Sequence, residues 1–195
     1  MVKPFIQDDA FARKARAEGY LARSAYKLAA IQEKFNLLKP GDRVLDLGAS
    51  PGSWLQVASE IAGPSGRVVG VDIAPIAFHA KNVIAIEADM LDAGLEDVLA
   101  EHAPFNVLLS DAAPKTSGIK DRDQALSEEL VERSLDLGET LLKPRGNLVA
   151  KLFQSPDTKA IAAAAKELFR LVHLHKPKAS RERSFETYLV CRDKR

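Results

Sequence analysis

The sequence predicts an α/β fold in which seven strands form a doubly wound, mostly parallel sheet with one antiparallel strand near an edge. Short apolar runs alternate with longer segments of helical periodicity through residue 169. Several of these runs end in aspartate or glycine, which is typical of strands whose carboxyl ends meet at a ligand-binding edge. No helix separates the last two runs, so the strands they form should pair antiparallel.

The expected elements follow the chain in a regular order. Strands are expected where apolar runs lie between turn residues, at 44–47, 68–72, 83–87, 105–110, 147–153, 171–175 and 185–191. Helices are expected where apolar side chains recur at helical spacing, at 13–19, 22–35, 54–62, 94–101, 123–142 and 157–169. Ser24 is a candidate cap of the second helix. The polar tract 115–122 should be a mobile loop beside the sheet edge, and it either closes over a substrate or is a surface linker.

Length and composition favour one domain over residues 1–195, with a basic helical extension at about 1–38. The 46% hydrophobic content is sufficient for a buried core. Cys191 is the only cysteine, which excludes an internal disulfide framework and a multi-cysteine zinc site and fits a reducing compartment. We find no export signal and no apolar run of about 18 residues, and we expect a cytoplasmic monomer without a membrane span or a bound metal.

Charge is distributed unevenly although the net charge is only +1. Residues 1–43 hold nine Lys/Arg against five Asp/Glu, residues 170–195 hold eight against three, and the residues between them carry a net −8. This pattern favours an acidic centre for a cationic cofactor and basic flanks for an RNA or DNA backbone, although solvated helix faces produce it too. The candidate RNA contacts are Arg13, Lys14, Arg16 and Arg23 at one end and Lys176, Lys178, Arg181 and Arg183 at the other.

The segment 44–54, VLDLGASPGSW, is the predicted centre of the protein. An apolar strand ends there in the glycine-containing turn 48–52, and a helix begins near Trp54. Glycines in such a turn let the backbone approach a ligand closely. Asp72 ends the next strand at about the interval expected of a ribose-binding carboxylate, which favours a ligand site over an ordinary turn.

Four carboxylates stand where predicted strands end, and they are Asp46, Asp72, Asp89 and Asp111. A dinucleotide would bring a pyrophosphate into this acidic edge, and the loop lacks the Gly-x-Gly-x-x-Gly spacing of dinucleotide sites. S-adenosyl-L-methionine has no phosphate, carries a sulfonium and an ammonium group, and has a ribose for Asp72. The sequence therefore favours S-adenosyl-L-methionine, while any single aspartate could instead cap a helix or close a turn.

The chain resembles the FtsJ/RrmJ family of methyltransferases over nearly its whole length. The segments that carry the resemblance occur in family order, and they are RSAYKL, DLGASPGSW, VDI, AD, SDAAP, AKLF and SFETYLV. The resemblance implies a Rossmann-like class I methyltransferase fold and methyl transfer to ribose 2′-hydroxyls of RNA. It also implies a catalytic tetrad of Lys27, Asp111, Lys151 and Glu186. The implied cofactor residues are Gly52, Trp54, Asp72, Asp89 and Asp111, in addition to Gly48 of the loop.

The lysines of the tetrad suit this chemistry, because a ribose hydroxyl is a poor nucleophile at neutral pH and needs positioning and help with its proton. Lys151 could act as a base if a nearby Lys27 lowered its pKa, or it could remain protonated and orient a hydroxyl lone pair. Both roles stay open. A snorkelling Lys27, a solvent-facing Lys151 and a surface Glu186 are the non-catalytic alternatives.

Other activities fit the sequence less well. Carbon-5 methylation of a pyrimidine needs a cysteine nucleophile, and Cys191 lies late in the last strand. Methylation of an exocyclic amine typically uses an Asp/Asn-Pro-Pro-aromatic loop, whereas this chain has DAAPK. The compact chain is similar to bacterial-type enzymes that act on a uridine of large-subunit ribosomal RNA. Transfer RNA, a messenger RNA cap, a small-molecule hydroxyl or a non-catalytic role in ribosome assembly remain as alternatives.

Overall fold

The structure is a computed structural model that describes residues 10–180 and 184–195. Residues 1–9, at the start of the predicted basic extension, and the candidate RNA contacts Arg181 and Arg183 lie outside the described residues. Within the described ranges, no helix is both long and apolar enough to cross a membrane.

The strands form one sheet with the order β3-β2-β1-β4-β5-β7-β6. Strand β7 runs antiparallel to both of its neighbours, and the other adjacent pairs are parallel, which confirms the predicted mostly parallel sheet. The strands are β1 (Arg43–Leu47), β2 (Arg67–Asp72), β3 (Val83–Glu87), β4 (Phe105–Ser110), β5 (Leu142–Phe153), β6 (Phe169–His175) and β7 (Glu186–Lys194).

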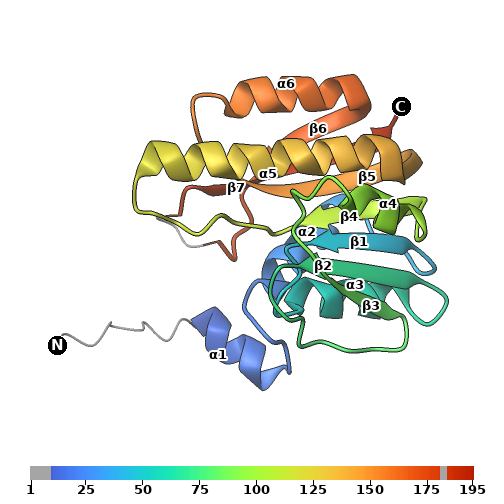
Figure 1. The fold of residues 1–195 in the computed structure, drawn as a ribbon. Helices are drawn as coiled ribbons and strands as arrows, with labels where there is room; N and C mark the ends of the chain where they lie inside the picture. The colour runs from blue at the N-terminus through green and yellow to red at the C-terminus, as the bar shows by residue number, and fades with distance from the viewer. Residues whose placement is uncertain (1–9, 181–183) are drawn as a thin grey trace.

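Helices cover both faces of this sheet (Figure 1). They are α1 (Ala10–Ala17), α2 (Ala25–Phe35), α3 (Ser53–Ala62), α4 (Leu95–Ala100), α5 (Lys120–Leu141) and α6 (Thr158–Leu168). Apolar side chains of α2 and α3 pack on one face, and those of α4, α5 and α6 pack on the other. Because strand side chains alternate between faces, each central strand supplies both cores: Val107 and Leu109 face α2 and α3, whereas Leu108 faces the other layer.

The predicted helix and strand positions hold, with differences at their ends. Helix α5 begins at Lys120 rather than at 123, so only the first part of the tract 115–122 is a loop. Asp123 fixes this loop, because its carboxylate accepts hydrogen bonds from the backbone N–H groups of Ser117 (2.7 Å) and Gly118 (3.2 Å). Ser24 precedes α2 as expected, but its side chain makes no capping hydrogen bond.

Candidate functional site

The tetrad residues of the strands lie on the same face of the sheet, because side chains alternate between the two faces along each strand. In β4, Val107 and Leu109 face α2, and Asp111 follows them at the same two-residue spacing. In β5, Lys151 follows Val149 in the same way. Both side chains therefore lie on the face that α2 covers. In β7, Glu186 belongs to the same series as Tyr188, which lies directly opposite Lys151 in the β5–β7 register. Lys27 completes the group from the buried side of α2, the helix that packs on this face of the sheet.

The four tetrad side chains form two adjacent ion pairs. The Lys151 ammonium lies 3.3 Å from Oδ1 of Asp111 and donates a hydrogen bond of 2.5 Å to the Asp111 backbone carbonyl. The Lys27 ammonium donates to Oε2 of Glu186 at 2.9 Å. Both lysines are buried, with 7% and 8% of their surface exposed, which excludes the solvent-facing and snorkelling alternatives for this structure.

The charge state of Glu186 follows from these neighbours. Burial alone would raise the pKa of its carboxyl, but the hydrogen bond and charge of Lys27, together with the charge of Lys151, lower the pKa below its ordinary value. Glu186 is therefore ionised at neutral pH, and it holds the Lys27 ammonium in place.

Tyr188 is a further member of the site that our sequence interpretation missed. Its hydroxyl donates to Oδ1 of Asp111 at 2.8 Å, and its ring stacks on that of Trp54 with centroids 5.8 Å apart. Burial, and then the charge and hydrogen bond of Asp111, hold the pKa of Tyr188 well above its usual value, so the hydroxyl remains a donor. Its spacing two residues after Glu186 was the signal that places it on the same face.

An acidic cavity of about 310 Å³ lies at the carboxyl ends of β1, β2, β3 and β4. Among the predicted cofactor residues, four line it, and they are Gly48, Asp72, Asp89 and Asp111. This is the location at which ligands bind to open α/β sheets. Because Asp111 also contacts Lys151, the acidic cavity and the tetrad are continuous.

The loop after β1 gives the acidic cavity its shape. Gly48 has a φ of +70°, and a Cβ atom at this position would lie 2.5 Å from the Cα of Ala112 in the loop after β4. Only glycine therefore allows these two loops to meet. Asp72 anchors the rest of the turn, since its carboxylate accepts hydrogen bonds from the N–H groups of Ser50 (2.9 Å) and Ala74 (2.8 Å).

Asp46 is fully buried in β1, two residues before Gly48 of the acidic cavity. Neither of its carboxylate oxygens has a hydrogen-bond partner within the described residues. Burial, and then the charges of Asp111 and Asp72, raise its pKa well above the usual value. Buried charges in proteins are normally paired, so this cluster of carboxylates fits a ligand that brings positive charge and a ribose. S-adenosylmethionine is a ligand of this kind.

Two of the predicted cofactor residues lie outside the wall of the acidic cavity, and they are Gly52 and Trp54. The Trp54 indole N–H instead donates to the Ser24 carbonyl at 2.9 Å, which joins α3 to the start of α2, while its ring supports Tyr188. Contact of Gly52 and Trp54 with a cofactor stays a prediction.

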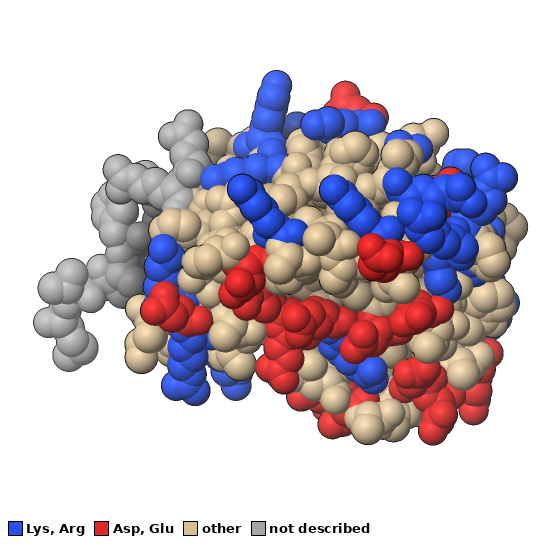
Figure 2. All heavy atoms as spheres, turned by 90° about the horizontal axis from the view of Figure 1, so that it is seen from above, with Lys and Arg blue, Asp and Glu red and all other residues tan. Residues whose placement is uncertain are grey.

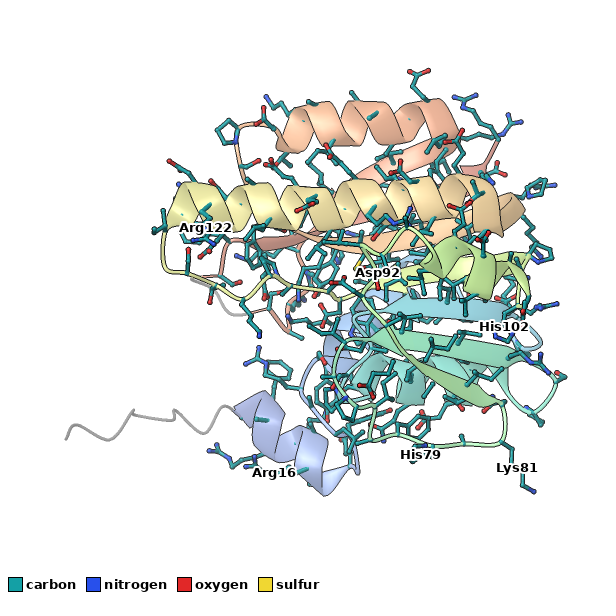
Figure 3. The ribbon with its side chains drawn as sticks, viewed as in Figure 1. Arg16, His79, Lys81, Asp92, His102 and Arg122 are labelled. Atoms are coloured by element: carbon teal, nitrogen blue, oxygen red, sulfur yellow. The ribbon has the colours of Figure 1, made fainter. Side chains whose placement is uncertain are left out.

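The basic segments from the two ends of the chain meet beside this site. The Arg23 guanidinium donates to the Ala179 carbonyl, and the Lys176 ammonium donates to the Ser184 carbonyl at 2.8 Å. Arg16 of α1 and Arg122 of α5 lie at the end of the molecule where α5 begins, and Lys81 and His102 lie at the opposite end (Figure 3). On the side of the molecule where α5 and α6 lie, acidic side chains form a band, with Lys and Arg side chains beside it (Figure 2). Helix α5 is rich in Asp and Glu, whereas α6 carries two lysines.

An open α/β sheet with a carboxylate-lined cavity at its strand ends, next to paired lysines and carboxylates, defines a group-transfer enzyme of the Rossmann-like class. Residues 20–194 match the family of FtsJ-like methyltransferases, and the chain belongs to this family. It is 48% identical over 185 residues to the ribosomal RNA large subunit methyltransferase E of Bdellovibrio bacteriovorus, with 93% of this chain and 94% of that protein covered. The same-named protein of Syntrophobacter fumaroxidans is 47% identical, with 93% of each chain covered.

A solved structure from Plasmodium falciparum, described as that of a ribosomal RNA methyltransferase, has the same fold with a TM-score of 0.78. It is 29% identical and covers 90% of this chain and 98% of its own. Our assignment of the fold as Rossmann-like and of the family from the sequence is therefore confirmed.

Proposed function

We propose that this protein transfers a methyl group from S-adenosylmethionine to a ribose 2′-hydroxyl of large-subunit ribosomal RNA. The observation that carries the proposal is the position of Lys151, which is buried between the acidic cavity and the Lys27–Glu186 pair. A buried lysine that touches the wall of a cofactor cavity can act on a hydroxyl held beside that cavity. The names of the relatives support ribosomal RNA as the substrate.

The acidic cavity would hold the methyl donor. Bound S-adenosylmethionine supplies an electrophilic methyl group on a positively charged sulfur. Asp72 and Gly48 both line this cavity, which supports a role for Asp72 as acceptor of hydrogen bonds from the ribose hydroxyls and a contact of the backbone after Gly48 with the methionyl part. The carboxylate oxygens of Asp46 have no hydrogen-bond partner within the described residues, and burial favours the protonated form of this side chain. A bound cation would favour the ionised form of Asp46 and attract it.

The tetrad would orient the acceptor. Lys151 donates to the Asp111 carbonyl and approaches the Asp111 carboxylate, and both contacts are made by an ammonium group acting as donor. A third N–H of this ammonium can donate to the 2′-oxygen and fix one of its lone pairs toward the methyl group. Tyr188 holds the Asp111 carboxylate that positions Lys151. As the new carbon–oxygen bond forms, the sulfur–methyl bond would break and S-adenosylhomocysteine would leave as a neutral thioether. The hydroxyl becomes acidic as its oxygen gives electron density to the methyl group, and its proton would pass to a water molecule. Lys151 keeps its own protons and holds the reacting oxygen in position.

The basic end of the molecule would hold the RNA backbone. Arg23 contacts the segment around Lys176 near the tetrad, whereas the acidic side chains of α5 form a band on another face of the molecule and would repel phosphates (Figure 2). All four tetrad side chains come from one chain, which supports action as a monomer. A ribosomal RNA substrate supports a cytoplasmic location.

The test is transfer of a tritiated methyl group from S-adenosylmethionine to large ribosomal subunits from cells that lack the protein. We expect label in RNA, recovered after alkaline hydrolysis as a dinucleotide, because a 2′-O-methyl group protects the adjacent phosphodiester. Label recovered in mononucleotides would indicate base methylation. If the protein binds S-adenosylmethionine but the RNA remains unlabelled, a non-catalytic role would be supported. Either result would contradict the proposal.

A further inference from the structure

A second hollow of about 240 Å³, here named the phenylalanine cavity, lies next to the tetrad. Phe153, at the end of β5, and Phe185, just before β7, form part of its wall together with Glu186 of the tetrad. Phe153 and Glu186 are direct partners in the β5–β7 register. Lys120 and Gln124, from the first turns of α5, line it as well.

The phenylalanine cavity and the acidic cavity have no lining residue in common, and the tetrad joins them. Asp111 belongs to the wall of the acidic cavity and Glu186 to that of the phenylalanine cavity. In a nucleotide, the base is attached to C1′, the carbon next to the one that bears the 2′-hydroxyl. A ribose whose 2′-hydroxyl reaches Lys151 therefore carries its base only a few bonds away, and the acidic cavity is already used by the methyl donor.

The side chains of the phenylalanine cavity suit an unpaired base. Phe185 lines the phenylalanine cavity and is 61% exposed, so part of its ring is open to a ligand. Single-stranded nucleic acids are commonly bound by stacking of bases on such rings. The Lys120 ammonium lies 5.5 Å from the centre of the Phe185 ring, where it offers positive charge to a neighbouring phosphate.

The wall formed by α5 is held in place before any ligand binds. The buried side chain of Gln124 donates to the Gln154 carbonyl, which ties α5 to the end of β5. Asp123 binds the backbone of the preceding loop at Ser117 and Gly118. An arrangement that is already fixed loses little conformational entropy when it binds a base.

We infer that the phenylalanine cavity receives the base of the acceptor nucleotide, stacked on Phe185, while its ribose lies at the tetrad. This inference rests on the proposed methylation of RNA ribose. It assigns Phe185 as a substrate contact and predicts that the acceptor nucleotide is unpaired, with its base turned out of any helix.

The test compares Phe185→Ala, Phe185→Trp and Leu171→Ala in methyl transfer to undermethylated large ribosomal subunits. Leu171 is a matched control, because it is an exposed apolar residue on β6 that is not part of either cavity. We expect Phe185→Ala to lower kcat/KM by roughly tenfold to a hundredfold, the loss typical of removing one stacked base. Phe185→Trp should stay within about threefold of wild type because it keeps a stacking ring, and the control should equal wild type.

Cofactor affinity, measured by calorimetry, should be the same in all three variants and wild type, which shows that the fold and the acidic cavity are intact. If wild type is active and Phe185→Ala matches the control, or if Phe185→Trp is as impaired as Phe185→Ala, the stacking role is wrong. If wild type itself labels no ribose, the proposed function fails instead, so the two failures are distinguishable.

Discussion

The acidic cavity takes its carboxylates from the ends of neighbouring parallel strands, whereas the tetrad takes its side chains from α2, β4, β5 and β7. Next to the acidic cavity, burial and then the charges of Asp111 and Asp72 disfavour ionisation of Asp46, which has no hydrogen-bond partner among the described residues. In the tetrad, each lysine is paired with a carboxylate, as Lys27 is with Glu186. The first region is thus completed by a cationic ligand, while the second is electrostatically balanced without one. Binding and turnover should consequently be separable by mutation.

The largest expected effect is on turnover. Lys151→Ala should lower kcat by about 10²- to 10⁴-fold or more while leaving cofactor affinity unchanged, because it removes a group needed in the transition state. Lys151→Arg should recover part of the rate, since arginine keeps a donor that can orient the hydroxyl. Single-turnover rates with saturating cofactor and RNA measure both effects.

Lys159→Ala provides the control for that pair, because Lys159 is an exposed lysine on α6. An arginine variant as inactive as the alanine variant would establish Lys151 as a base, because arginine does not deprotonate in proteins. Near-wild-type rates in both variants would remove Lys151 from catalysis.

The next effect is on binding. Asp72→Ala should weaken S-adenosylmethionine binding about tenfold to a hundredfold, which corresponds to loss of roughly 1.5 to 3 kcal/mol of charged hydrogen bonding. Calorimetry measures the affinity, and Asp97→Ala on the exposed side of α4 is the control. Asp72→Asn removes the negative charge but keeps a side-chain oxygen that can accept a backbone hydrogen bond in the turn, so it separates the effect of charge from the effect of turn structure. An unchanged affinity in Asp72→Ala would contradict the ribose-binding role.

A third effect concerns stability without cofactor. Because the pKa of Asp46 is raised in the folded protein, its ionisation disfavours folding: there is no penalty below the unfolded pKa of about 3.9, and a growing one as pH rises toward the folded pKa. Asp46→Asn should therefore gain Tm relative to wild type as pH increases from about 4 to about 8, and it should bind S-adenosylmethionine more weakly. A Tm difference that is constant over this range would show that Asp46 does not carry the expected penalty.

The smallest effect per residue is on RNA binding. Charge reversal of Arg13, Lys14 and Arg16 should weaken RNA binding and reduce the slope of log K against log salt, by about 0.7 to 0.9 for each phosphate that the variant no longer binds. The matched control is the pair Arg67 and Lys81, which are exposed at the amino-terminal ends of β2 and β3. Equal slopes for the α1 variant and this control would mean that α1 is only a solvated helix.

The elements that local patterns define were predicted well. Strands β3 and β4 have the predicted bounds, because an apolar run between turn residues needs no knowledge of its neighbours. The tetrad residues were found through the family resemblance, and the structure brings all four together. The phenylalanine cavity was missed because it depends on the register between β5 and β7. The spacing of Tyr188 from Glu186 was a usable signal, but its role depends on a contact with the distant Asp111. The position of Trp54 under Tyr188 depends likewise on contacts between distant segments.

Strand β7 is synthesised last but lies inside the sheet, between β5 and β6. Folding during translation proceeds from the amino terminus, so a ribosome-bound nascent chain can pair β1 to β4 and close the acidic cavity first. Glu186 and Tyr188 are added only when β7 enters the gap beside β5. A newly made molecule should therefore gain the ability to hold a methyl donor before it gains the machinery to use one.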